Sequence, residues 1–304
     1  MRLISFKHPD GPRPGVALTD KVCLDLVAAD RSLPRSWNAL FARMSEVRRL
    51  ADRWRNPGDV IDGVPLFSRT KYPLLPPIPA PSKIIAVGLN YRDHAEEQRK
   101  APPPRPMLFS KATTCLQADR GPILLDPDLT QVDAEAELAV VIGRAGRRIS
   151  RADAPAHIAG YMCFNDVSDR EAQQADKQFF RGKSLDTGGP CGPWLVTPDE
   201  LPPLADGLGI TGTLNGEVVQ RSNTDQLIFP IDELIRFASL HMTLLPGDII
   251  TTGTPPGVGM GRRDAAGQPA PRYLKKGDVM TLGIDGLGQQ RQQVVAFRAP
   301  TAAR

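Results

Sequence analysis

The chain has 304 residues, of which 41% are hydrophobic and 24% charged, and its formal net charge at pH 7 is +4. This composition is typical of a folded water-soluble protein and argues against a disordered chain. Acids and bases are interleaved, and no basic block or zinc-finger spacing is present, so we expect no nucleic-acid partner.

Membrane and export signals are missing from the printed sequence. No apolar run approaches the roughly 20 residues of a membrane-spanning helix, and the first 15 residues lack an apolar signal-peptide core. The four cysteines (Cys23, Cys115, Cys163 and Cys191) form no CxxC pair, as expected for reduced thiols. We therefore expect a cytoplasmic protein with no membrane partner.

The first part of the chain predicts a small α/β domain. Short strands are expected at 3–6, 15–19 and 22–26. In SWNALFARMSEVRRLADRW (36–54) apolar side chains recur at helical spacing, and Asn56-Pro57-Gly58 is a helix-stop signal. The proline-rich stretch KYPLLPPIPAPSK (71–83) predicts a linker. We place the domains at 1–75 and 76–304.

The second domain predicts mostly strands rather than a βαβ series. Proline supplies 30 of the 304 residues, about twice its usual share, which together with 27 glycines favours short strands and turns. Strands are expected at 83–88, 107–110, 135–142, 160–165, 193–197 and 210–214, and helices at 90–100, 166–179 and 231–241. Asn215-Gly216 is a type I′ hairpin signal. The predicted fold class is α+β, mainly β.

Two glutamates in VDAEAELAVVIG (132–143) raise a question of charge. Glu135 and Glu137 are two residues apart and therefore emerge on the same face of a strand, where they repel each other. One interpretation is a solvated face. The other is a hard divalent cation, Mg²⁺ or Mn²⁺, which prefers carboxylate oxygens. Asp166 in GYMCFNDVSDR is a candidate third ligand, with a helix N-cap as the alternative.

Two further motifs offer polar chemistry. His94 and Glu97 in NYRDHAEE are neighbours on a helical turn, where a carboxylate can orient an imidazole base; a surface pair is the alternative. Lys183 lies in the glycine-rich turn RGKSLDTGGPCGP, beside Thr187, and its ammonium can stabilise an oxyanion; an ordinary surface loop is the alternative.

The stretch GDIITTGTPPGVGMG (247–261) does not predict a nucleotide-binding loop. It matches neither GxGxxG nor GxxxxGK[ST], and Pro255-Pro256 occupies the place where a helix would begin. Thr252 and Thr254 can instead offer hydroxyl groups to a bound carboxylate.

Six motifs in order resemble the fumarylacetoacetate hydrolase family. They are KIIAVGLNYRDHAEE, DAEAELAVVIG, GYMCFNDVSDRE, GKSLDTGGPCGPW, NGEVVQRSNT and LLPGDIITTGTPPGVG. The resemblance runs from Lys83 to about Phe297. It implies a mixed β-roll whose metal site opens into a cleft, a small N-terminal domain, and a homodimer.

The resemblance also implies roles for individual residues. It implies metal ligands at Glu135, Glu137 and Asp166, catalytic groups at His94, Glu97 and Lys183, and substrate-binding groups at Thr254, Thr187, Tyr91 and Arg92. The cofactor would be Mg²⁺ or Mn²⁺, and His94 and Glu97 would lie on a mobile lid.

The expected function is a metal-dependent hydrolase that cleaves a C–C bond in a small anionic 1,3-dicarbonyl or 2-oxo acid, either an acylpyruvate or a compound like fumarylacetoacetate. A 2-hydroxyhepta-2,4-diene-1,7-dioate-type isomerase or hydratase, or an oxaloacetate decarboxylase of aromatic catabolism, is the alternative with related enolate chemistry. A non-catalytic protein that binds 2-oxo acids is an alternative of another class.

Overall fold

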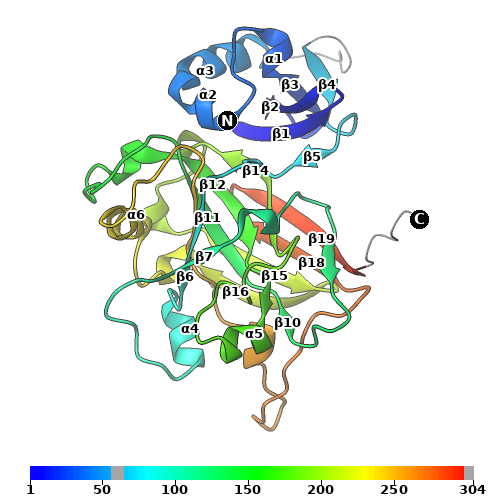
Figure 1. The fold of residues 1–304 in the computed structure, drawn as a ribbon, viewed down its shortest axis with the longest axis vertical. Helices are drawn as coiled ribbons and strands as arrows, with labels where there is room; N and C mark the ends of the chain where they lie inside the picture. Colours follow the sequence, from blue (N-terminus) through cyan, green and yellow to red (C-terminus); the bar gives the residue numbers. More distant parts are fainter. Residues whose placement is uncertain (56–64, 298–304) are drawn as a thin grey trace.

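Figure 1 shows a small N-terminal lobe joined to a larger lobe, in a computed structural model that describes residues 1–55 and 65–297. The predicted α+β class with strands predominating is confirmed. Over the described residues, none of the helices has the length and apolar character needed to span a bilayer.

The small lobe packs a helical layer on a short antiparallel sheet. Its strands are β1 (Arg2–His8), β2 (Gly11–Ala17), β3 (Val22–Asp25) and β4 (Leu66–Ser68), and its helices are α1 (Leu26–Ala29), α2 (Trp37–Leu40), the 3₁₀ turn η1 (Phe41–Arg43) and α3 (Met44–Arg53). The predicted helix at 36–54 is confirmed, with a 3₁₀ turn inside it. Its predicted stop signal, Asn56-Pro57-Gly58, lies outside the described residues.

The sheet of the small lobe continues into the larger lobe. β1 pairs on one side with β2 and on the other with β14 (Gly189–Val196), where Leu3 lies opposite Leu195. The predicted linker (71–83) contains β5 (Leu74–Leu75), which also pairs with β1. Because ordered hydrogen bonds cross from lobe to lobe, the boundary at residue 75 stays a prediction.

The main sheet is mixed, as the resemblance implies. Its strand order is β4-β3-β2-β1-β14-β12-β11-β17-β6-β7, with β8 beside β14. The strands not yet given are β6 (Ile84–Gly88), β7 (Met107–Lys111), β8 (Leu116–Gln117), β11 (Ala136–Ile142), β12 (Ile158–Asn165) and β17 (Ile249–Thr251). Most neighbours are antiparallel, but β17 runs parallel to β6, and β8 parallel to β14.

A second sheet packs against the first. Its order is β16 (Glu217–Asn223), β15 (Gly209–Leu214), β18 (Val279–Ile284), β19 (Gly288–Ala296) and β9 (Ile123–Leu125). Asn215 and Gly216 both have positive φ in the two-residue turn between β15 and β16, so the predicted hairpin is confirmed. A two-strand ribbon joins β10 (Val132–Asp133) to β13 (Ser168–Asp169).

The helices of the larger lobe are short. They are α4 (Arg92–Glu97), α5 (Arg170–Ala175) and α6 (Ile231–Ser239), with 3₁₀ turns η2 (Thr113–Cys115), η3 (Ala154–His157), η4 (Pro198–Glu200), η5 (Leu204–Asp206), η6 (Thr224–Gln226) and η7 (Gly259–Gly261). The helix expected at 231–241 is confirmed. The helix expected at 166–179 is wrong at both ends, because β13 precedes it and α5 stops at Ala175.

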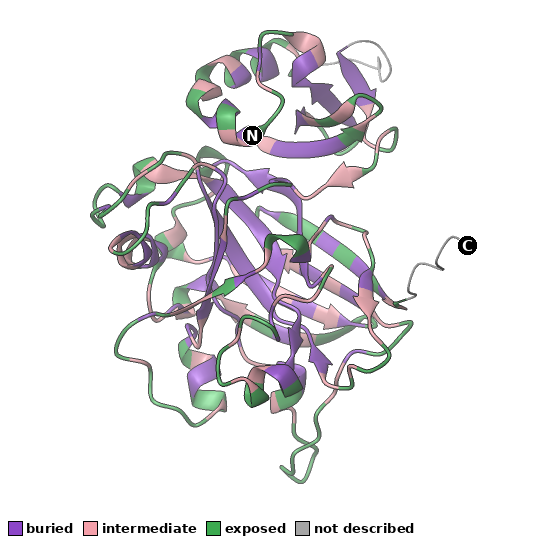
Figure 2. Ribbon diagram, in the orientation of Figure 1, coloured by how far each residue is buried: buried purple, intermediate pink, exposed green. Residues whose placement is uncertain are grey.

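Strand β11 lies at the centre of the molecule and is buried on both faces (Figure 2). Leu138 and Val140 pack with Ile210 and Leu282 of the second sheet. The opposite face packs into a cluster that reaches the small lobe and includes Leu3. The two lobes therefore share a sheet and a core.

This continuity predicts a single unfolding transition. Leu3→Ala should lower the free energy of unfolding by about 2–5 kcal/mol, because Leu3 is fully buried in the cluster that spans the lobes. For the wild-type protein and for Leu3→Ala, the denaturant unfolding curve measured by circular dichroism should coincide with the curve measured by tryptophan fluorescence. Leu245→Ala, at a side chain 42% exposed, is the control and should change stability by less than about 0.5 kcal/mol. Separate transitions for the two lobes would contradict the prediction.

Candidate active site

The two glutamates are buried within the main sheet. Glu137 lies in β11, Glu135 immediately precedes this strand, and the two are 1% and 6% exposed. The strand has β12 on one side and β17 on the other, with packed side chains over both faces. The interpretation as a solvated face is therefore wrong.

Asp166 joins the glutamates from the end of β12. It is fully buried, and its backbone N–H donates to the Glu135 carbonyl oxygen at 2.9 Å. One oxygen from each of Glu135, Glu137 and Asp166 lies within 4.8 Å of the others. The alternative of a helix N-cap is wrong for Asp166, because Asp169 caps α5 by accepting from the Glu171 and Ala172 amides.

Three buried cations surround these carboxylates. Lys183 Nζ lies 2.6 Å from Glu135 Oε2 and 2.9 Å from Asp166 Oδ2. Lys111, at the end of β7, donates to Asp166 Oδ1 at 2.6 Å. Arg170 contacts Glu135 Oε1 at 2.6 Å through NH1, and Asp133 Oδ2 at 2.7 Å through NH2. Each of these cations therefore has at least one carboxylate partner, whose attraction offsets the free-energy cost of removing the cation from water.

The electrostatic balance differs between the two glutamates. Burial raises the pKa of Glu135, but the charges of Lys183 and Arg170 outweigh burial and leave it at about 2. Burial and the neighbouring charges of Asp166 and Glu135 raise the pKa of Glu137 well above its ordinary value. Burial also opposes the charge of Lys183, but the carboxylates of Asp166 and Glu135 raise its pKa. The anionic form of Glu137 is therefore the one charge here that lacks compensation.

This donor set fits a hard divalent cation. Three carboxylates from separate segments converge in a buried place, and Mg²⁺ and Mn²⁺ prefer such oxygen ligands. The uncompensated Glu137 points to the same conclusion, because a dication would stabilise its anionic form.

A histidine–carboxylate pair lies on α4. His94 Nδ1 is 2.9 Å from Glu97 Oε2, and the ring is 5% exposed. The other oxygen of Glu97 accepts from the Gly257 N–H at 2.9 Å, so this carboxylate also links α4 to the turn that follows Thr254. The pair is therefore held in place by backbone as well as by its own helix.

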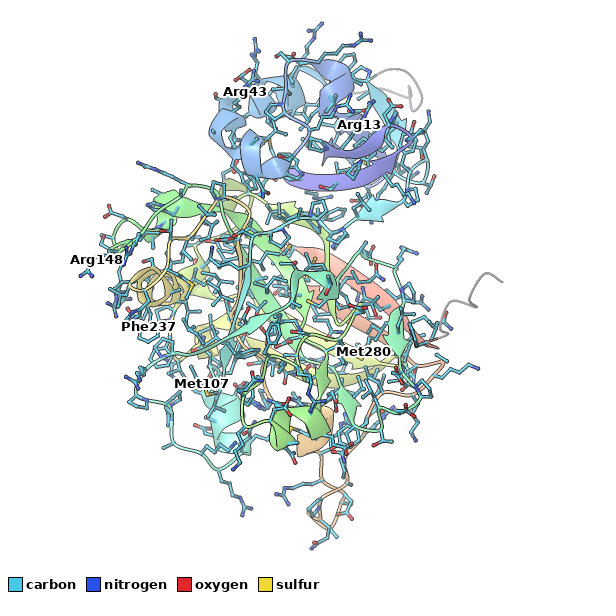
Figure 3. The ribbon with its side chains drawn as sticks, in the orientation of Figure 1. Arg13, Arg43, Met107, Arg148, Phe237 and Met280 are labelled. Carbon is cyan, nitrogen blue, oxygen red and sulfur yellow. The ribbon has the colours of Figure 1, made fainter. Side chains whose placement is uncertain are left out.

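A cavity of about 360 Å³ brings the two clusters together. Its polar lining residues are His94, Gln98, Lys100, Glu135, Arg170, Gln173, Gln174, Lys183 and Thr254, and its large apolar ones are Val87, Leu89, Met107, Phe109, Phe179, Val258 and Met260. Two of the elements that supply them, α4 and α5, lie at the end of the larger lobe far from the small lobe (Figure 1). Met107, labelled in Figure 3, is 44% exposed.

Thr254 is the one predicted substrate-binding residue on the cavity wall. Its hydroxyl donates to the Ala136 carbonyl oxygen at 3.0 Å and accepts from Gln220 Nε2 at 2.8 Å. A hydroxyl oxygen has a second lone pair, which leaves Thr254 able to accept one more hydrogen bond.

The structure does not bring the other three predicted substrate-binding residues to the cavity. Thr187 accepts from the Leu124 amide at 2.8 Å and so fixes β9. Tyr91 is fully buried in the core beside Leu227, and burial raises its pKa. Arg92 donates to the Asp225 carbonyl oxygen and lines a different hollow. Thr187 and Arg92 bond to other parts of the chain, and the Tyr91 hydroxyl is buried with no hydrogen-bond partner among the described residues. The three assignments therefore stay predictions.

Sequence reasoning missed Asp133, Lys111 and Arg170. Asp133 shares the alternation of Glu135 and Glu137, and three acids at alternate positions were the available signal. Lys111 shares a strand face with Phe109, which lines the cavity. Arg170 sits inside the motif that supplied Asp166, but nothing local distinguishes it from a surface arginine.

Comparisons with known proteins agree with this geometry. The family model described as fumarylacetoacetate (FAA) hydrolase C-terminal matches residues 83–295. The mitochondrial oxaloacetate tautomerase Fahd2a of Rattus norvegicus is 39% identical over 301 residues, covering 97% of this chain and 92% of the relative. A 2,4-didehydro-3-deoxy-L-rhamnonate hydrolase of Sphingomonas sp. (strain SKA58) is 46% identical over 223 residues, which are 73% of this chain and 76% of the relative.

A solved structure extends the likeness to the whole fold. The maleylpyruvate hydrolase of Sphingobium sp. SYK-6, in complex with manganese(II) ion and pyruvate, superposes with a TM-score of 0.77 at 29% identity, covering 98% of this chain and all of the other. The chain therefore belongs to the fumarylacetoacetate hydrolase family, a family of enzymes.

Proposed function

We propose that this chain is a divalent-metal-dependent hydrolase that cleaves a C–C bond in a small 1,3-dicarbonyl 2-oxo acid such as an acylpyruvate. The observation that carries the proposal is that one cavity is lined both by the base His94 and by Glu135 and Lys183 of the carboxylate cluster. Relatives named for action on maleylpyruvate and on a deoxy-rhamnonate derivative support a small organic acid as substrate.

Glu135, Glu137 and Asp166 would hold Mg²⁺ or Mn²⁺. A bound dication of this kind supplies a Lewis acid for the carboxylate and keto oxygens of a 2-oxo acid. A comparison of the affinities of the protein for Mg²⁺ and Mn²⁺ would show which of the two metals it prefers.

Lys183 supplies positive charge close to the oxygen on which negative charge develops as the enolate forms. Two of its three N–H groups face Glu135 and Asp166, and the third is available to an oxygen in the cavity. An ammonium fixed by two carboxylates needs no reorganisation as the enolate of the leaving 2-oxo acid develops. Thr254 can accept one further hydrogen bond at the same wall.

His94 would act as the general base. Its Nδ1 proton is held by Glu97, which leaves Nε2 as the atom that takes a proton from water. The resulting hydroxide adds to the distal carbonyl carbon, the C–C bond breaks, and the electron pair passes to the 2-oxo acid fragment as its enolate. The enolate carbon released from the broken bond then takes the proton that Nε2 had removed from water, so the hydrolysis consumes one water and gives a carboxylate and a 2-oxo acid.

The alternative is an isomerase, tautomerase or decarboxylase that uses the same enolate chemistry. The observation that favours it is the oxaloacetate tautomerase, 39% identical over nearly the whole chain. Keto–enol conversion moves a proton without adding water, so it would depend less on a base that activates water. The homodimer implied by the resemblance remains a separate proposal, which light scattering tests.

Metal binding should disappear when Glu137 is replaced. Glu137 makes no ion pair among the described residues, so Glu137→Gln removes a ligand without stranding a buried cation. Calorimetry should detect Mg²⁺ and Mn²⁺ binding to the wild-type protein, and at 100 times Kd the metal should stabilise it by about 2.7 kcal/mol, an effect that EDTA reverses. Glu217→Gln, at an exposed glutamate paired with Arg272, is the control and should bind normally. Equal binding by both variants would refute the metal site.

Replacing the base should separate the two candidate reactions. His94→Asn should lower kcat for acylpyruvate hydrolysis by about 10²–10⁴-fold, because water loses its general base. Tautomerisation of oxaloacetate should fall much less, and metal binding should be unchanged. His241→Asn, at an exposed histidine, is the matched control. Ultraviolet assays with and without EDTA measure both reactions, and wild-type protein that turns over no acylpyruvate would exclude the hydrolase.

A further inference from the structure

Gln98 is a cavity residue that the proposed mechanism leaves without a role. It follows α4 directly as its C-cap residue and lines the cavity together with His94. Its side-chain nitrogen Nε2 lies 2.6 Å from His94 Nε2, the ring nitrogen assigned above to proton abstraction.

The two partners of the ring fix where its proton resides. A carboxylate only accepts hydrogen bonds, so Nδ1 must carry a proton that it donates to Glu97. An amide nitrogen only donates, so the lone pair of Nε2 must accept from Gln98. Together these contacts select the neutral ring with its basic nitrogen facing the cavity.

We propose that Gln98 is a positioning residue that keeps His94 in this neutral tautomer, ready to take a proton at Nε2. The inference rests on the proposed function, in which His94 is the base. When water replaces the amide nitrogen, one proton moves from that water to Nε2 and leaves a hydroxide, while the Nδ1 proton stays on the ring and is donated to Glu97. A half-turn of the amide then presents its carbonyl oxygen, which can accept the new Nε2–H.

The surroundings of the ring make Gln98 a sensitive position. Within the described part of the chain, Glu97 is the one carboxylate that contacts the ring. Asp93, also on α4, instead accepts from the His94 backbone N–H and from the Ser222 hydroxyl. A glutamate at position 98 would therefore place a second acceptor on the ring, at Nε2, and would favour a ring protonated on both nitrogens.

The experiment compares Gln98→Glu with Gln98→Met in the full-length protein supplied with Mg²⁺. Imidazole ¹⁵N spectra at pH 7 report the protonation of each ring nitrogen, and His94→Asn assigns the His94 signals. In the wild-type protein we expect an unprotonated Nε2 and a protonated Nδ1, and in Gln98→Met, which offers Nε2 no donor, we expect a larger protonated fraction at Nε2. In Gln98→Glu we expect both to be protonated. Gln289→Glu, which adds the same charge at an exposed position of β19, should leave the spectrum unchanged.

Kinetics provide the second readout. For the acylpyruvate that the enzyme turns over, Gln98→Met should lower kcat by no more than about tenfold, the equivalent of one neutral hydrogen bond. Gln98→Glu should lower kcat by about 100-fold with little change in KM, because the base is already protonated. If Gln98 only filled space, Gln98→Met and Gln98→Glu would have similar kcat values.

Two results would overturn the proposal. One is a wild-type Nε2 that is already protonated, which would mean that the amide carbonyl faces the ring. The other is a Gln98→Met protein whose His94 signals match those of the wild-type protein. Both are read from the spectra alone, so failure to find a substrate would count against the proposed hydrolase and not against the role of Gln98.

Discussion

The structure depends on keeping a dense group of charges out of water, with every member except Glu137 in an ion pair within the described residues. The buried members are Asp133, Glu135, Glu137 and Asp166 on the negative side, and Lys111, Arg170 and Lys183 on the positive side. An isolated buried ion costs several kcal/mol even after the protein relaxes, so each member is tolerable only in the presence of the others. The group has one more acid than base, and a dication would more than offset that excess, which leaves room for an anionic ligand.

The sheet explains how so many segments reach the same place. Glu137 is on the central strand, Asp166 follows the neighbouring strand, and Lys111 ends a strand at the far edge of the sheet. Arg170 and Lys183 come from segments that cross the ends of these strands. Because the small lobe extends the same sheet through β1 and β14, the charged group rests on a framework that includes both lobes.

The sequence predicts the parts of this site that are local. The i,i+2 spacing of Glu135 and Glu137 and the i,i+3 spacing of His94 and Glu97 both survive in the structure, because strand and helix geometry fix them. The ordered motifs also identify the family, and with it the strand-rich fold. Lys111 could not be assigned in this way, because its partner Asp166 lies 55 residues along the chain and only the folded sheet brings the two together.

Three predicted substrate-binding residues stay predictions, because the structure places them away from the cavity wall. Thr187 follows Lys183 by four residues along the chain, but its hydroxyl accepts from the Leu124 amide and supports β9. Tyr91 and Arg92 precede His94, but successive residues point in different directions at the start of a helix. Nearness in sequence indicates a shared function only where the side chains share a face.

One carboxylate ties the proposed base to a turn outside its own helix. Glu97 accepts from the His94 ring with one oxygen and from the Gly257 amide with the other. If α4 swung outward to admit a reactant, the amide contact would break and the carboxylate would lose one of its two tethers. The His94 ring would then be fully oriented only after α4 had returned and both contacts of Glu97 had formed again. Substrate binding and reaction would then occur in sequence, because the base would be oriented only after α4 had returned. A molecule too large to allow that return would be a poor substrate.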